Sequence, residues 1–450
     1  MVALLAVTPI RAALYPISYY YYYYYYFSPL LINVITSQKR KRILEPVHYV
    51  NSHNSIDRDF YFYCFPPRYR MASIINEFLS KAATRIARGA SDLTVVMGNE
   101  GGDMDSVIGS IYLAYLFDNK KSLGISNPVP LLNFPVEDVP LRNDVAKLLQ
   151  ELNIDHTKIG SAVQSGQGIF CNLRQLEPYV ILYDHNKLNS SQEYLRNCVV
   201  GVVDHHFDEK LYKPTGQKIN VNRTVGSACT LVVELFKREE VPIPCPQLLM
   251  APIVLDTVNF DESQKKVTPA DIAAFKYLND AAESPVDATS LFTKLSAWKN
   301  DIMSLTVEQN LKRDYKHFDF ALPYGKLSTG ISSVPCARSQ FEENYSLQKV
   351  YDSCARFLTK NELEFLIIAF AGKVGGVHSR QVLFFGPEEN LEYFVAYAES
   401  SPSGIAFTKE ISLTDTRLTL ISYSLSDASV SRKRLAPSLA DFLSKGVSSL

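Results

Sequence analysis

The sequence has little net charge, no paired cysteines and few histidines, and these shortages exclude several classes of protein. Its 450 residues carry a formal net charge of −1, so no overall charge steers the chain towards nucleic acid or an anionic membrane. The seven cysteines are scattered, without a CxxC pair. This pattern argues against a disulfide framework or a zinc–thiolate site and favours a reducing compartment. The hydrophobic content of 46% and charged content of 21% are ordinary for a globular protein, and the length suggests two or three domains.

The amino terminus differs from the rest of the chain. The first 44 residues contain no Asp or Glu and include eight consecutive tyrosines. The uncharged stretch 12–38 is long enough to span a bilayer and is followed by the basic run "KRKR". Two prolines interrupt this stretch, however, and it lacks a helical period. We interpret residues 1–70 as a low-complexity or disordered extension. The alternatives are a targeting segment, a membrane anchor or an over-extended gene start. The functional chain is expected to begin near Met71.

Beyond this extension, short apolar runs alternate with helical patterns. "YVILY" (179–183) and "VVGVV" (199–203) are continuous apolar runs of strand length, and so is "LTVVM" (93–97), which a helical pattern at 106–117 follows. Continuous apolar strands separated by helices indicate a parallel sheet that is covered on both faces. The predicted fold class is therefore α/β, with a parallel-sheet domain at 71–280.

A change of composition at about residues 280–300 is typical of a linker. We expect a second, smaller α/β domain at 285–450. This part ends with the basic segment "SRKRLAP" (431–437) and shows no transmembrane run. Its strand candidates are 326–334, 365–370, 381–385 and 418–423.

Polar clusters follow the predicted strands of the first domain. "GNEGGDMDS" supplies Asp103 and Asp105, "DHN" supplies Asp184, "DHH" supplies two adjacent histidines, and the helical run 247–260 delivers Asp256. Ligands of parallel sheets collect beyond the carboxyl ends of the strands. Four carboxylates at one edge would repel each other without cations. Two divalent ions roughly 3.5–4 Å apart would remove this repulsion and generate a hydroxide for in-line phosphoryl transfer.

Each cluster alone has an ordinary explanation. A lone DxD is usually a solvated loop, Asp184 or Asp256 could each cap a helix, and a histidine pair could lie in a polar rim. The four motifs, however, fall in order at strand ends, and this joint pattern favours a metal site. A site rich in carboxylates with one or two imidazoles suits Mg²⁺ or Mn²⁺.

In that order, the motifs "GNEGGDMDS", "YDHN", "VVDHHFDE", "VGSACT" and "LDT" resemble those of the DHH phosphoesterase superfamily. "RDYKHF" (313–318) and "SRKRLAP" resemble the two basic signatures of the carboxy-terminal DHHA2 domain. That domain occurs in family II inorganic pyrophosphatases, in cytosolic exopolyphosphatases and in the prune proteins. The resemblance covers roughly residues 90–440. It argues against the RecJ-type nucleases, whose glycine-rich partner motif is missing here.

The resemblance implies that the domain at 71–280 is a metal-binding catalytic domain, that the domain at 285–450 binds substrate, and that the active site lies in the cleft between the two domains. It also implies a role for each matching residue. Asp184 is expected to bridge the two metals, and His206 to face the substrate phosphate. Lys316, Arg432 and Lys433 are implied to clamp the phosphates, and Arg434 to extend the clamp. The metal ligands implied by the resemblance are Asp103, Asp105, Asp184, His205, Asp256 and Asn99. The catalytic groups are His206, Asp184, Lys316 and Arg432. His378 and Arg380 are candidates for a basic channel, but these two residues could equally lie on an exposed strand edge.

Asn99 discriminates among the relatives. Family II pyrophosphatases carry a histidine at this position, whereas asparagine is similar to the exopolyphosphatase and prune branch and favours Mg²⁺. Prune proteins lose the second histidine of the third motif, which this chain keeps as His206. The resemblance thus implies an exopolyphosphatase, cytoplasmic by default with mitochondria as a minority alternative, monomeric, and acting on inorganic polyphosphate. A pyrophosphatase, a prune-like phosphodiesterase or short-chain polyphosphatase, and a catalytically silent scaffold remain the alternatives.

Overall fold

A computed structural model describes residues 67–166, 168–212, 218–323, 325–415 and 417–445. The interpretation of the amino-terminal extension falls on residues 1–70, of which 1–66 lie outside the described residues. The helix expected from Met71 is present as α3 (Pro67–Ala87) and begins before that methionine. Among the described residues, no helix is long and apolar enough to cross a membrane.

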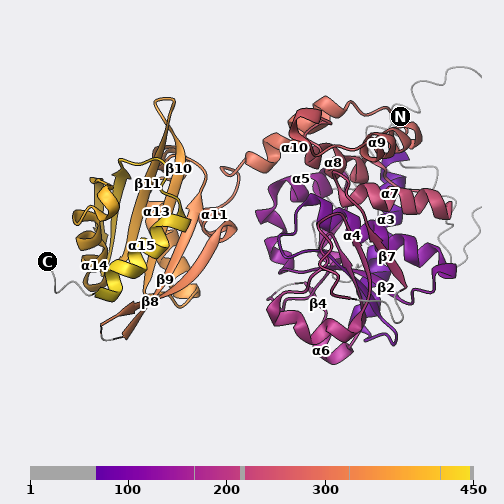
Figure 1. Ribbon diagram of the computed structural model, residues 1–450, viewed down its shortest axis with the longest axis horizontal. Helices are drawn as coiled ribbons and strands as arrows, with labels where there is room; N and C mark the ends of the chain where they lie inside the picture. The colour runs from indigo at the N-terminus through magenta and orange to yellow at the C-terminus, as the bar shows by residue number, and fades with distance from the viewer. Residues whose placement is uncertain (1–66, 167, 213–217, 324, 416, 446–450) are drawn as a thin grey trace, which may run out of the picture. The chain divides into compact units, whose positions relative to one another are not determined.

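The predicted parallel sheet is confirmed. Its strand order is β4-β3-β2-β1-β5-β6-β7, and every described pairing is parallel. The three predicted apolar runs form β1, β5 and β6, which lie next to one another between β2 and β7, both labelled in Figure 1. The strands are β1 (Thr94–Met97), β2 (Pro128–Leu132), β3 (Gly160–Ser161), β4 (Ile169–Phe170), β5 (Tyr179–Tyr183), β6 (Val199–Asp204) and β7 (Ile219–Asn222).

Helices cover both faces of this sheet, which explains why its central strands are apolar throughout. Val96 of β1 belongs to a core that contains α4, α7 and α8 (the first core), whereas its neighbours Val95 and Met97 pack into a separate core with the end of α3. Alternate side chains of a strand point to opposite faces, so two covered faces require a continuous apolar run. The other helices of this part are α4 (Met104–Asn119), α5 (Asn143–Glu151), α6 (Leu173–Leu176), α7 (Ala228–Glu239), α8 (Gln247–Asp256) and α9 (Pro269–Ala281).

The stretch expected to be a linker is helical over most of its length. Residues 288–300 form α10 (Ala288–Asn300), whose amino terminus is capped by the Asp287 side chain. Leu291 and Leu295 of α10 are buried in the first core. Phe292 and Trp298 pack against the same core, so this stretch is a docked helix, and its role as a linker between two domains stays a prediction.

The second sheet is mixed. Its order is β12-β13-β11-β10-β9-β8, in which only the β9–β10 pair is parallel among the described pairings. The four expected strands are present, while β8 and β12 had not been predicted. The strands are β8 (Tyr315–Leu322), β9 (Gly325–Val334), β10 (Phe365–Val374), β11 (Val377–Pro387), β12 (Phe407–Asp415) and β13 (Leu418–Leu425).

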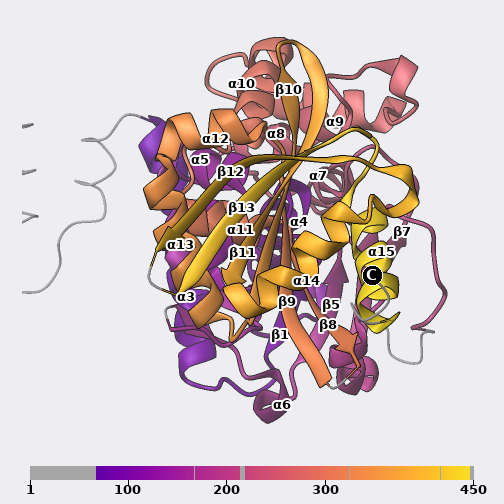
Figure 2. The same cartoon turned by 90° about the vertical axis from the view of Figure 1, so that its left-hand side faces the viewer.

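This sheet is also covered on both faces. Figure 2 shows α12 and α13 on one side of it and α14 and α15 on the other. Accordingly, Ile367 of β10 packs in one core with α14 and α15, and its neighbours Leu366 and Ile368 pack in another with α12 and α13. The helices are α11 (Val307–Arg313), α12 (Arg338–Tyr345), α13 (Leu347–Lys360), α14 (Glu388–Glu399) and α15 (Arg432–Lys445).

The docking of α10 can be tested by truncating a buried side chain. Leu295 is 0% exposed, so Leu295→Ala should lower the free energy of unfolding by about 2–5 kcal/mol. The measurement is urea unfolding followed by the fluorescence of Trp298, the only tryptophan of the chain. Thr293→Ala on the exposed face of α10 is the control. Equal midpoints for the two variants would contradict the packing of α10 against the first core.

Candidate active site

The loop between β1 and α4 carries the first two candidate ligands. Asp103 caps α4, its side chain accepting a hydrogen bond from the backbone N–H of Ser106 at 3.0 Å. Gly102 just before it has φ +60°, and a Cβ there would lie 2.0 Å from the Phe134 ring. Glycine is therefore required for the loop to turn so closely over that ring. Arg142 stacks on Phe134 with 3.7 Å to the ring centroid and donates to the Gly101 carbonyl, which fixes the loop from outside.

Asp105 lies in the first turn of α4 and is 2% exposed. Its carboxylate accepts hydrogen bonds from the Ser227 hydroxyl at 2.8 Å and from the backbone N–H groups of Ala228 and Cys229 at 2.6 and 2.8 Å. These donors form the amino terminus of α7, where the helix dipole favours a negative charge. The motif "VGSACT" therefore serves to orient this carboxylate.

Asp184 follows β5 in the left-handed region, with φ +59°. This conformation is uncommon for aspartate and turns its side chain out of the strand direction. Its Oδ1 lies 3.3 Å from His205 Nε2, and its Oδ2 accepts a hydrogen bond from Asn99 Nδ2 at 2.8 Å. Burial raises the pKa of Asp184 to about 7; the charges of Asp105 and Asp103 add to this rise, and the hydrogen bond with His205 opposes it. Without cations, this carboxyl group is thus difficult to ionise.

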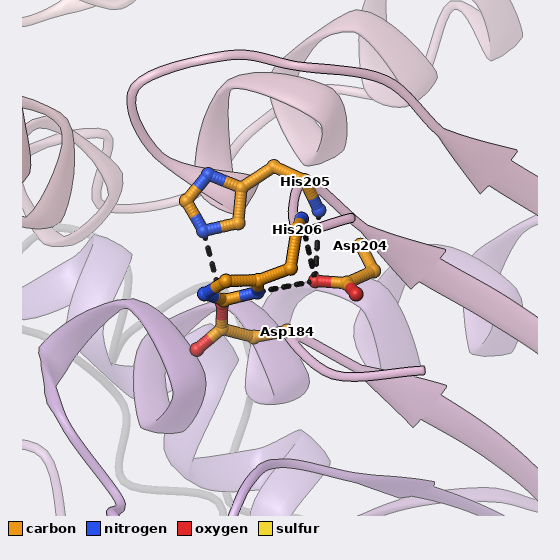
Figure 3. Close-up of side chains that lie close together, drawn as sticks. All are labelled: Asp184, Asp204, His205 and His206. Carbon is orange, nitrogen blue, oxygen red and sulfur yellow. Dashed lines mark hydrogen bonds and ion pairs between the residues drawn. The ribbon is translucent and has the colours of Figure 1, made fainter. Parts of the chain in front are cut away.

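The two histidines at the end of β6 are oriented differently (Figure 3). His205 Nδ1 donates to the carbonyl of Val225 at 2.9 Å, which directs Nε2 towards Asp184 and towards Asp105 at 4.0 Å. A backbone carbonyl commonly orients a metal-ligating histidine in this way. Burial disfavours the charged ring of His205, yet the hydrogen bond with Asp184 and the charge of Asp105 raise its pKa to about 10.

His206 pairs through Nδ1 with Asp204 at 2.8 Å, and its side chain is 59% exposed. This hydrogen bond raises the pKa of His206, although partial burial opposes the rise. A ring that is protonated and anchored at Nδ1 presents its Nε2–H group as a donor. His205 is therefore a largely buried ring that faces Asp184 and Asp105, whereas His206 is held by Asp204 and is largely exposed to solvent.

Asp204 is a site residue that the sequence reasoning missed. It is 0% exposed, and its oxygens accept from the backbone N–H groups of His205 and His206 and from Asn186 Nδ2 at 2.5 Å. Burial opposes ionisation, but the hydrogen bonds from His206 and Asn186 lower the pKa of Asp204. The sequence could have indicated this role, because Asp204 lies at the end of an apolar run, as the other candidate ligands do. Together with three predicted residues it forms a group whose ligand atoms lie within 4.8 Å of one another: Asp184, Asp204, His205 and His206.

The remaining predicted carboxylates flank this group. Asp256 ends α8, and burial together with the charges of Asp105 and Asp103 raises its pKa well above the usual range. Asp184 contributes to the same rise. The negative charges of Asp103, Asp105 and Asp184 therefore all act on Asp256. Such a set of oxygen ligands with one oriented imidazole fits a divalent cation site.

Asn99 has a well-defined orientation. Its amide oxygen accepts a hydrogen bond from the Gly102 N–H at 2.9 Å, while its NH₂ group faces Asp184. Because the partner of the oxygen is a backbone donor, the amide cannot be reversed without losing this bond. In this arrangement Asn99 positions Asp184, and its own role as a metal ligand stays a prediction.

Basic side chains surround a cavity of about 600 Å³ in the part of the chain that carries the second sheet. Arg432 is held beside it by Asp314, with a nitrogen–oxygen distance of 2.5 Å. The amino terminus of α15 begins at Arg432, so its unpaired N–H groups also favour an anion there. The charged residues that line the cavity are Arg313, Asp314, Arg380, Arg432 and Lys433.

The other predicted cations lie elsewhere. Arg434 is paired with Asp427 at 2.9 Å. Lys316 on β8 and His378 on β11 are exposed and are not among the residues that line this cavity. Arg313 was missed in their place. The basic pair "KR" before "DYK" indicated a cation in this segment. Which of the two side chains lines the cavity depends on where α11 ends, and the sequence did not predict that end.

Both parts of the chain are similar to known protein families. Residues 93–255 match the DHH family, N-terminal domain, and residues 293–442 match the DHHA2 domain. Exopolyphosphatase PRUNE1 of Mus musculus is 29% identical over 365 residues, which cover 78% of this chain and 76% of that protein. A manganese-dependent inorganic pyrophosphatase of Methanothrix thermoacetophila is 26% identical over 235 residues, which cover 51% and 67%. The crystal structure of an exopolyphosphatase-related protein from Bacteroides fragilis aligns at 11% identity and a TM-score of 0.35, covering 83% of this chain and 96% of that one.

The chain therefore belongs to the DHH phosphoesterases and carries a DHHA2 domain.

The two shifted pKa values predict how stability depends on pH. The pKa of Asp184 rises from 3.8 to about 7, and the pKa of His205 rises from 6.5 to about 10. Both groups bind protons more tightly in the folded state, so their contribution is complete at low pH and is lost as pH rises through the folded values. Without divalent ions, the melting temperature should therefore fall between pH 6 and pH 9.

Magnesium should reduce this fall, because it binds the deprotonated carboxylates and replaces the protons. The measurement is calorimetry of the chelator-treated protein with and without Mg²⁺ across that range. Asp184→Asn, which cannot ionise, is the matched control and should flatten the dependence. A melting temperature that rises from pH 6 to pH 9 without metal would contradict the assignment.

Proposed function

We propose that this protein is an exopolyphosphatase that hydrolyses the terminal phosphoanhydride of inorganic polyphosphate and releases orthophosphate. The observation that carries the proposal is the pairing of an acidic cluster suited to divalent ions with a cavity of about 600 Å³ lined by four cationic side chains. Such a cavity can accept several consecutive phosphates. The similarity to Exopolyphosphatase PRUNE1 supports the same substrate class.

Asp103, Asp105, Asp184, His205 and Asp256 would hold two divalent ions, Mg²⁺ or Mn²⁺. Bound there, such ions would supply hydroxide near neutral pH. Asp105 is kept in place by the amino terminus of α7, and His205 by the Val225 carbonyl. The carboxylates are thus preorganised, and little rearrangement is required at the moment of reaction.

His206 would act on the substrate side. Asp204 holds its Nδ1, so its exposed Nε2–H group can donate to an oxygen of the transferring or leaving phosphate. Arg432 and Lys433, with Arg380 and Arg313, would neutralise the following phosphates, and Lys316 is proposed to join them in the cleft between the two domains. Arginine forks onto phosphate oxygens, and lysine supplies a compact charge.

The proposal is tested by phosphate release from the full chain in Mg²⁺. Long-chain polyphosphate is compared with pyrophosphate and tripolyphosphate, and the remaining polymer is resolved by length on a gel. We expect steady release of single phosphates from long chains, with pyrophosphate left intact. Turnover of pyrophosphate or tripolyphosphate alone would contradict the proposal in favour of a pyrophosphatase or a prune-like enzyme. No turnover of any of the three would favour a scaffold.

The basic cavity gives a second prediction. Lys433 lines the cavity and makes no hydrogen bond or ion pair with another described residue, so Lys433→Ala removes one cation with little effect on folding. KM for long-chain polyphosphate should rise about tenfold, as the loss of one charge-assisted hydrogen bond implies. Lys445→Ala, on the same helix but paired with Asp441, is the control. Identical kinetics for the two variants would exclude the cavity from substrate binding.

A further inference from the structure

A two-stranded hairpin extends from the wall of the basic cavity. The pairing of β10 with β9 ends at Phe370, and the pairing of β11 with β13 begins at Arg380. Among the described pairings, residues 371–379 are therefore bonded only across the hairpin itself, which Figure 1 shows projecting beyond the rest of the second sheet. We call residues 371–380 the ribbon. Ala371 and Arg380, which lie directly opposite each other at its base, both line the cavity.

The ribbon has a defined direction. Its tip is the two-residue turn Gly375–Gly376, with φ of +58° and +84°, and glycine is favoured at both positions of such a turn. Near the base, a Cβ on Gly372 would lie 2.0 Å from the backbone nitrogen of Ala337. The ribbon backbone thus packs directly against the residue before α12, where only glycine fits. Its two faces consequently keep a fixed orientation relative to the cavity.

The two faces of the ribbon differ in chemistry. Lys373 and His378 are directly opposed, two residues further along than the pair Ala371 and Arg380. Opposed residues share a face of the sheet, and so do residues two apart along a strand, so all four side chains lie on the face that lines the cavity. The same alternation continues to Val382, which packs in the core with α14 and α15. The basic face of the ribbon is therefore on the side of the sheet that α15 covers.

The side chains of Lys373 and His378 are available to a ligand. Both are exposed, and neither makes a hydrogen bond or ion pair with another residue in the part of the chain that the structure describes. At about 3.4 Å per residue, they lie roughly 7 Å beyond Arg380 along the ribbon. Together with Arg432 and Lys433 at the cavity, they form a strip of N–H donors that leads from the cavity towards the tip.

Charged side chains on a projecting hairpin also have an ordinary role, since they discourage pairing with other strands. Charges on either face would serve that role. The opposite face at the tip instead carries Val374 and Val377, whose exposed fractions are 48% and 71%. The basic side chains are thus confined to the face that continues the cavity, and this favours an anionic ligand that leaves the cavity along the ribbon.

We propose that Arg380, Lys373 and His378 bind the part of a polyphosphate chain that extends out of the basic cavity, and that the ribbon thereby gives the enzyme a preference for long chains over short ones. This inference rests on the proposed function and deepens it. A short chain can be held by the cavity of about 600 Å³ alone, whereas a long polymer must leave it. The repeating charges of the polymer then meet Lys373 and His378, which supply charge-assisted hydrogen bonds.

The test compares long-chain polyphosphate with tripolyphosphate, using the full chain in Mg²⁺. The double substitution Lys373→Ala with His378→Ala should raise KM for long-chain polyphosphate about fivefold or more, because two exposed charge contacts are lost. The Ki of tripolyphosphate as a competitor and the value of kcat should not change. Lys373→Arg, which keeps the charge, should keep the wild-type KM. Val377→Thr, on the opposite face of the same ribbon, is the matched control and should also keep it.

An equal rise in KM and in the Ki of tripolyphosphate would overturn the inference, because it would indicate a disturbed cavity. An unchanged KM would overturn it too, as would an equally large rise for Val377→Thr, which would indicate an effect on the fold of the ribbon. A wild-type protein that tripolyphosphate does not inhibit would contradict the premise that the cavity alone holds a short chain. A wild-type protein that hydrolyses no polyphosphate contradicts the proposed function itself, whereas an active one with an unaffected variant contradicts only the role of the ribbon.

Discussion

The crowding of carboxylates at the carboxyl edge of a buried parallel sheet is the constraint on which this site depends. Asp105 and Asp184 are each 2% exposed, and burial, together with the negative charges of Asp105, Asp103 and Asp184, raises the pKa of Asp256. A protein gains nothing in stability from such an arrangement. It becomes favourable when divalent ions replace the protons, so the geometry is explained by metal binding and by the phosphoester chemistry that metal ions support.

The surrounding structure serves to hold these charges in place. The amino terminus of α7 fixes Asp105, the Val225 carbonyl fixes the His205 ring, and the Asn99 amide fixes Asp184. Each contact uses a backbone group or a neutral side chain, so orientation is achieved without adding charge. The use of neutral groups to orient the charged ones explains why the motifs contain glycine, serine and asparagine between their acidic residues.

Sequence patterns predicted the central strands well because β1 and β5 are covered on both faces and are therefore apolar throughout. They did not predict β2, which contains two prolines, or β7, a half-exposed edge strand with the sequence "INVN". They also did not predict α10, whose apolar residues Leu291, Phe292 and Leu295 stand in a polar stretch. For the site, the order of the motifs along the chain led to the prediction of Asp103, Asp105, Asp184 and Asp256 as ligands. The role of Asp204 and the orientation of Asn99 depend on hydrogen bonds between distant segments, which no local pattern specifies.

The central claim is that the acidic cluster is a two-metal centre, and anomalous diffraction from crystals grown with Mn²⁺ tests it most directly. The account predicts two peaks roughly 3.5–4 Å apart on either side of Asp184, with His205 Nε2 as a ligand of one of them. A cluster without a peak under saturating Mn²⁺, or with a single ion bound away from Asp184, would contradict it.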